Sequence, residues 1–140
     1  MSSISHNHFS FKSFCDMNFS GGDLSSNCGL MLVGQFMENM GITSFMKDNF
    51  RADKNRRAEH TDVDILLQLI YQNIAGYNTD DAADHLAYEP IMTTLLHKDR
   101  LASQPTISRF RNRLDAVSLI ELNDVLMYMR KRAYEKFSPK

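Results

Sequence analysis

The sequence predicts a mainly α-helical fold: a compact multi-helix domain preceded by a short segment that resembles a β-hairpin. Three observations lead to this class. Apolar residues recur every three or four positions along most of the chain, which is the spacing of helices that bury one face. Signals for strands are confined to the N-terminal segment. A chain of 140 residues with 43% hydrophobic residues is also long and apolar enough for one domain with its own core.

The N-terminal segment is rich in Ser, Asn and Phe and shows no helical periodicity. We expect residues 1–13 to be disordered and residues 14–26 to form weak strand. Gly21-Gly22 followed by Asp23-Leu24 is a sequence that can turn a short hairpin. The domain is therefore expected to occupy residues 14–137.

Helical spacing begins after this segment. The first apolar series is Leu30, Val33, Met37 and Met40. Gly41 supplies a stop for that helix. A shorter helix is expected over residues 42–49, and residues 51–60 form a charged loop.

The helix that starts at Thr61 is expected to lie at the centre of the domain. Thr61 can cap it, and Asp64 three residues later completes a variant of the capping box. Its surface is apolar nearly all round, with one polar stripe of Asp64, Gln68 and Gln72. A helix of this kind is usually buried. Gly76 is expected to end it.

Four further helices are expected after Gly76. Thr79 is expected to cap an acidic helix that runs to about Ala87, and Pro90 to begin the next helix. The expected elements after Pro90 are a helix to about residue 96, a loop over 97–103, a helix over 104–114 and a long helix over 117–137.

The distribution of charge matters more than the net charge of −1, which by itself argues against a nucleic-acid-binding protein. Residues 58–97 hold seven acids and no Lys or Arg. Residues 98–140 hold ten bases and five acids, a net of +5. Such asymmetry favours an anionic partner, although a set of solvated basic loops would give the same pattern.

The stretch LASQPTISRFRNRL, residues 101–114, is the most informative. On a helical wheel Ile107, Phe110 and Leu114 share an inward face, and Arg109 and Asn112 point the other way. In the major groove, Arg commonly forms paired hydrogen bonds with guanine, and Asn does so with adenine. A helix, a loop and a polar-faced helix also outline a loose helix-turn-helix. The alternative is an amphipathic surface helix with an ordinary basic face.

These patterns predict a set of DNA-contacting residues. The candidates for base or phosphate contact are Thr106, Ser108, Arg109, Asn112 and Arg113. The candidates for backbone phosphates alone are Lys98, Arg100, Arg56 and Arg57. Hydroxyl groups, amides and guanidinium groups are the donors that DNA contacts use most.

Neither a catalytic nor a metal site is expected. The acids near residues 62–64 and 80–84 fall at helix starts, where negative charge is favourable. His6, His8, Cys15 and Cys28 match no zinc spacing. The sequence also lacks a P-loop, a secretory signal and an apolar run of the ~20 residues that a membrane span needs. We expect a cytoplasmic protein.

Three segments together resemble the DDE transposases (group 1 type) of bacterial insertion sequences. They are FSGGDLSSNCGLMLVGQFMENMGI from residue 19, HTDVDILLQLIYQNIAGYNTDDAADHLAYEP from residue 60, and LASQPTISRFRNRLD from residue 101. Their order and spacing agree with the family. Two sites depart from it. Asn27-Cys28-Gly29 stands where Asp-Gly-Gly is common, and Leu86-Ala87-Tyr88 lacks the usual Arg after Leu.

The resemblance implies an N-terminal DNA-binding and assembly region. In the family a long helix leads into an RNase H-like domain whose three catalytic acids hold two divalent ions, Mg or Mn. That domain is expected to be absent here, so the chain would be no enzyme on its own and would hold no cofactor. The implied partner is double-stranded DNA at terminal inverted repeats, near the nucleoid. The alternative is a protein–protein module without DNA binding of its own. It would use residues 30–40, 59–89 and 117–129 to self-associate, to pack on the absent catalytic domain, or to inhibit full-length transposase by forming mixed oligomers.

Overall fold

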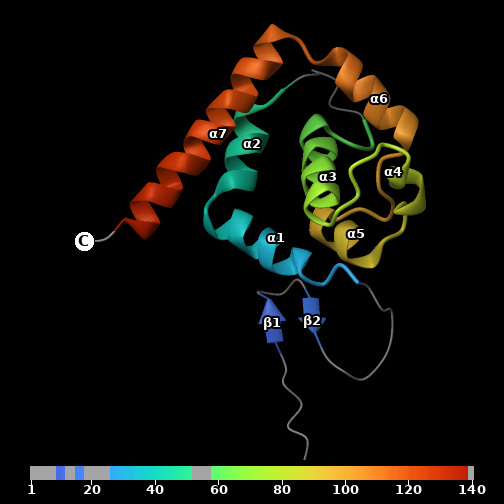
Figure 1. Cartoon of the computed structure of the whole chain (residues 1–140), viewed down its shortest axis with the longest axis horizontal. Helices are drawn as coiled ribbons and strands as arrows, with labels where there is room; N and C mark the ends of the chain where they lie inside the picture. The colour runs from blue at the N-terminus through green and yellow to red at the C-terminus, as the bar shows by residue number, and fades with distance from the viewer. Residues whose placement is uncertain (1–8, 12–14, 18–25, 52–57, 139–140) are drawn as a thin grey trace, which may run out of the picture.

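The computed structural model describes residues 9–11, 15–17, 26–51 and 58–138, and within them the fold is mainly α-helical as predicted (Figure 1). The helices in this described part are α1 (Leu30–Asn39), α2 (Ile42–Asn49), α3 (Asp62–Ile74), α4 (Ala82–His85), α5 (Pro90–Leu96), α6 (Gln104–Arg113) and α7 (Ala116–Phe137). None of them is long and apolar enough to cross a membrane.

Two short strands precede the helices. β1 (Phe9–Phe11) pairs antiparallel with β2 (Cys15–Met17), with Phe9 opposite Met17. β1 falls within residues 1–13, which were expected to be disordered. The expected turn at Gly21-Gly22 lies outside the described residues, so the structure gives no support to a hairpin over residues 14–26.

α3 lies at the centre of the domain, as predicted, and contacts α5 and α6 (Figure 1). Its capping box is confirmed. The N–H of Asp64 donates to Thr61 Oγ1 at 3.2 Å, and the N–H of Thr61 donates to Asp64 Oδ2 at 2.9 Å. The polar stripe is not solvated, because the side chains of Gln68 and Gln72 are each only 1% exposed. These two amides therefore lie inside the core.

The short helix α4 begins differently from the prediction. Its N-cap is Asp81, and no side chain caps it. Thr79 contributes its backbone oxygen instead, which accepts from the N–H of Ala82 at 3.2 Å. The expected Thr79 cap is therefore wrong, because a turn of backbone hydrogen bonds precedes the helix. The start of α5 is as predicted: Pro90 occupies its first turn, and Glu89 accepts from the N–H of Met92 at 2.7 Å.

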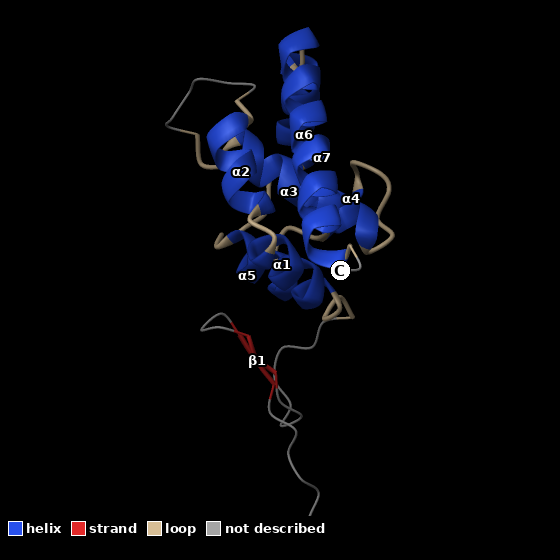
Figure 2. Cartoon of the chain, turned by 90° about the vertical axis from the view of Figure 1, so that its left-hand side faces the viewer, coloured by secondary structure: helices blue, strands red, loops and turns tan. Residues whose placement is uncertain are grey.

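α7 runs alongside α2 at one side of the domain (Figures 1 and 2). The rings of Phe45 and Tyr128 stack with centroids 4.1 Å apart. Arg132 Nε donates to the carbonyl oxygen of Met40 at 3.2 Å, where α1 gives way to α2. Asp115 caps the start of α7 by accepting from the N–H of Ser118 at 2.9 Å. One side of α7 is thus attached to α2 along much of its length.

Candidate nucleic-acid interface

α6 is fixed at its start by residues that are distant in sequence. Ala102, just before the helix, donates its N–H to Gln68 Oε1 at 2.8 Å, and its carbonyl accepts from Gln68 Nε2 at 2.9 Å. The N–H of Gln104 donates to Asp84 Oδ1 at 3.1 Å, which links α6 to α4. The candidate DNA-binding helix is therefore positioned by α3 and α4.

One face of α6 belongs to the core, as the helical wheel predicted. Ile107 and Phe110 are buried and Leu114 is half-buried. The ring of Phe110 meets that of Phe50 edge-on, with centroids 6.3 Å apart. This packing fixes the rotation of α6 about its own axis, so the opposite face must point to solvent.

Arg109 and Asn112 are on this opposite face, three residues apart and both exposed. Neither forms a hydrogen bond or an ion pair with any residue that the structure describes. A guanidinium group and an amide on adjacent turns of an exposed helix have the donors and acceptors that read base edges. These two side chains form the centre of the candidate interface.

The two hydroxyl groups beside them, those of Thr106 and Ser108, already take part in hydrogen bonds within the chain. Thr106 Oγ1 lies 3.0 Å from Ser103 Oγ, and Ser108 Oγ accepts from Gln104 Nε2 at 3.2 Å. Both residues are half-buried. Each hydroxyl can still donate or accept a further hydrogen bond. Thr106 and Ser108 therefore lie beside the interface and can add to DNA contact, but they are not its central residues.

The other two arginines of α6 pair with carboxylates of the domain. Arg111 Nη2 lies 2.8 Å from Asp80 Oδ1, and Arg113 Nη2 lies 2.7 Å from Asp62 Oδ1. Asp62 is buried at 8% exposure. At least one N–H of Arg113, a predicted DNA contact, is therefore used to hold α6 against the start of α3.

These two ion pairs were not found by sequence reasoning. Asp62 and Asp80 were expected only to favour helix starts by their charge. Asp62 lies 51 residues before Arg113, so no helical spacing connects them. The signal that was present is the division of the chain into an acidic and a basic region, which the fold brings together at α6.

Lys98 also has a structural role. Its Nζ lies 3.0 Å from Asp64 Oδ2 and donates to the carbonyl oxygen of Glu59 at 2.7 Å. Burial raises the pKa of the Asp64 carboxyl, but hydrogen bonds from Thr61 and Lys98 outweigh burial and hold the pKa below its usual 3.8. Lys98 therefore stabilises the first turn of α3.

Replacing Asp64 with Asn should lower the free energy of unfolding by about 1 kcal/mol near neutral pH, because the charge-assisted bond to Lys98 is lost. A lowered pKa stabilises the fold above 3.8, and this stability is lost as the pH falls through the folded-state value. Urea melts of both proteins should therefore converge below pH 3.8. A difference independent of pH would show that the ionised carboxylate is not its source.

Arg100 is exposed beside the candidate helix. Its guanidinium carbon lies 5.5 Å from the ring centroid of Tyr88, a cation–π distance. Tyr88 is exposed as well. Arg56 and Arg57 lie outside the described residues. Among the predicted phosphate contacts, Arg100 is therefore the exposed one that the structure places.

The expected helix-turn-helix is not supported. α5 mainly contacts α1 and α3, whereas α6 mainly contacts α3 and α4. The two helices joined by the 97–103 loop therefore do not pack as a unit. The reason is that the central helix α3 lies against both and supplies the apolar surface that each one buries.

No metal centre is assigned. Within residues 26–51, 58–138 and the two strands, no three His, Cys, Asp or Glu side chains are grouped so that they could hold a metal ion. The carboxylates of Asp62, Asp64 and Asp80 make ion pairs with α6 or with the 97–103 loop. The described residues therefore do not form the acidic cluster that a divalent ion requires.

A protein-family model described as "Transposase DDE domain group 1" matches residues 8–140. Neither the curated proteins nor the solved structures gave a match. The match spans most of the chain and includes every helix described above. The chain therefore belongs to the group 1 family of DDE transposase domains.

Proposed function

We propose that this chain serves DNA transposition by binding the terminal inverted repeats of a bacterial insertion sequence. The family supports a role in transposition. The observation that carries the more specific proposal is the exposed pair Arg109 and Asn112 on α6. Their side chains are available to a partner, and the core fixes the helix that carries them.

α6 would enter the major groove, which admits an α-helix. Arg109 would contact guanine and Asn112 adenine, with Thr106 and Ser108 beside them. Backbone phosphates would be held by Arg100, Arg56 and Arg57. Arg113 and Lys98 would add only the N–H groups that their bonds to Asp62, Asp64 and Glu59 do not use. Recognition by a helix braced on α3 and α4 does not require a helix-turn-helix unit.

We propose that the described residues bind DNA without cutting it. The carboxylates near the candidate interface are engaged with Arg111, Arg113 and Lys98. Among the residues that the structure describes, no three potential ligands are grouped so that they could hold a metal ion. Cleavage of a repeat duplex by the purified chain in magnesium or manganese would contradict this assignment.

Binding to a duplex with the terminal repeat should be specific and strongly dependent on salt. With about five to seven phosphate contacts, the logarithm of the association constant should fall against log salt with a slope of about −4 to −6. Fluorescence anisotropy with a labelled repeat and a scrambled duplex measures both properties. Equal affinity for the two duplexes would remove the claim of specificity, and no binding at low salt would overturn the proposal.

A further inference from the structure

The outer side of α7 is an exposed apolar face. The side of α7 toward α2 buries Ser118 and Val125. On the other side six large apolar side chains are between 54% and 70% exposed: Leu119, Ile120, Leu126, Met127, Tyr134 and Phe137. Large apolar side chains exposed together on one side of a helix mark a site of association.

The spacing of these residues is that of a helix which pairs with another helix. Leu119 and Leu126 are seven residues apart, and so are Ile120, Met127 and Tyr134. A seven-residue apolar repeat keeps one seam directed at a partner helix over several turns. The face therefore suits a second helix lying along α7.

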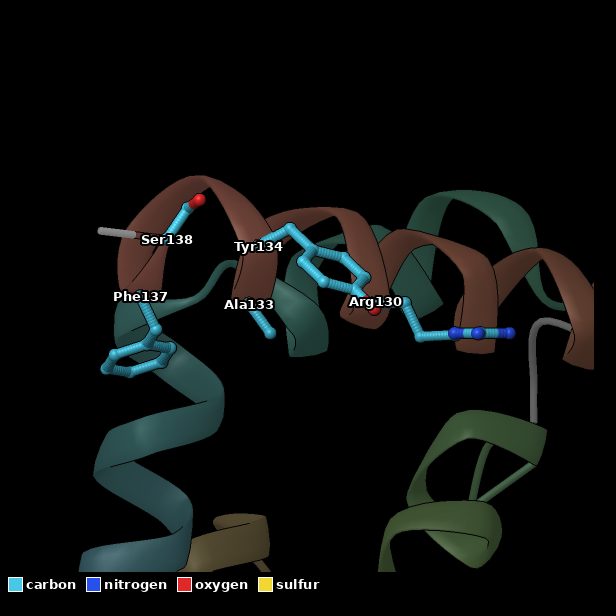
Figure 3. Close-up of a pocket in the computed structure, with 5 residues that line it drawn as sticks. All are labelled: Arg130, Ala133, Tyr134, Phe137 and Ser138. Atoms are coloured by element: carbon cyan, nitrogen blue, oxygen red, sulfur yellow. The ribbon is translucent and has the colours of Figure 1, made fainter. Parts of the chain in front are cut away.

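The C-terminal part of this face contains a hollow of about 500 Å³ (Figure 3). Arg130, Ala133, Tyr134 and Phe137 surround it, with Ser138 at its edge. These four residues are spaced i, i+3, i+4 and i+7, the arrangement that receives one side chain of a facing helix in knobs-into-holes packing. The small side chain of Ala133 leaves the space.

The charges on the face select the direction of the second helix. Asp124 lies in its first half and Arg130 in its second, both exposed, and neither forms an ion pair with a described residue of its own chain. A parallel copy of α7 would place like charges together. An antiparallel copy, with its two-fold axis near Met127, places Asp124 opposite Arg130 and Ile120 opposite Tyr134, which lines the hollow.

We propose that α7 pairs with the α7 helix of a second copy of this chain, antiparallel and about a two-fold axis near Met127. The contact is isologous, so the same residues serve on both copies. It extends beyond the proposed function, because it needs no DNA and uses none of the candidate DNA-binding residues. Its failure would therefore leave that proposal intact.

The first test is the monomer–dimer equilibrium measured by analytical ultracentrifugation without DNA. The chain should form dimers. Asp124→Arg and Arg130→Asp should each weaken dimerisation by about tenfold or more, because like charges then face each other. The double variant should restore it, since the pair is exchanged. Asp48→Arg, an exposed charge on α2, is the matched control and should leave the equilibrium unchanged.

Cross-linking tests the direction independently. With Cys15 and Cys28 replaced by Ser, chains carrying Ile120→Cys should form disulfides with chains carrying Tyr134→Cys. Chains carrying Ile120→Cys alone should not, because the antiparallel register keeps the two 120 positions apart. A strict monomer, a dimer insensitive to both charge reversals, or self-linking of Ile120→Cys would each overturn the proposal.

Discussion

Replacing Arg109 with Ala is expected to reduce discrimination between the terminal repeat and a scrambled duplex by about 1–3 kcal/mol, roughly 5- to 150-fold. Arg109 lies on the exposed face of α6 and has no described partner within the chain. The fold gains little from its guanidinium group, so stability should be nearly unchanged. Anisotropy titrations with both duplexes at one salt concentration measure the effect.

Two further variants separate base reading from charge. Arg109→Lys keeps the positive charge but loses the paired N–H groups that contact guanine, so affinity should persist while discrimination falls. Arg111→Ala removes an arginine from the same helix that is paired with Asp80, 2.8 Å away. It should leave the ratio of the two affinities unchanged. If Arg109→Ala and Arg111→Ala behave alike, Arg109 is not a reader of bases.

Gln68→Leu should lower the free energy of unfolding by about 2–5 kcal/mol. Both hydrogen bonds of the Gln68 amide go to the backbone of Ala102, which is itself 1% exposed. Leucine would leave a buried N–H and a buried C=O unpaired, each at about 1–3 kcal/mol. The variant should also weaken DNA binding, because Ala102 leads directly into α6. Urea denaturation followed by circular dichroism measures the loss.

Gln72 provides the matched control, one turn further along α3. It is equally buried, but its Nε2 has no hydrogen-bond partner among the described residues. Gln72→Leu removes a buried donor that the fold does not use, so stability should stay within about 1 kcal/mol or rise. Equal losses from Gln68→Leu and Gln72→Leu would show that burial of an amide, and not the bond to Ala102, decides the effect.

Local signals in the sequence sufficed for much of the helical framework. The Thr61–Asp64 capping box and the helix start at Pro90 are as predicted, since both depend on residues a few positions apart. The burial of Ile107 and Phe110 follows from helical spacing in the same way. The Thr79 cap was wrong because a turn of backbone hydrogen bonds precedes α4, and backbone hydrogen bonds of this kind are not visible in the pattern of side chains.

The candidate interface was predictable in part. Helical spacing alone placed Arg109 and Asn112 on the solvent side of α6. It could not show that Arg113 on the same helix, or Lys98 in the loop before it, already has a carboxylate partner within the chain. Only the partners distinguish them: Arg113 meets Asp62 and Lys98 meets Asp64. Those contacts join α6 and the loop before it to the start of α3.

The sequence by itself determined that this protein is helical, where most of its helices run, and which side of α6 is apolar, because hydrophobic periodicity and capping act over one or two turns. Tertiary structure decided what faces each polar group. It placed Gln68 on Ala102, paired two arginines of α6 with distant acids, packed α6 against α3 and α4, and left the outer face of α7 bare. These contacts depend on which helices pack against α3. That choice involves residues far apart in the sequence, so it is made only when the whole domain folds.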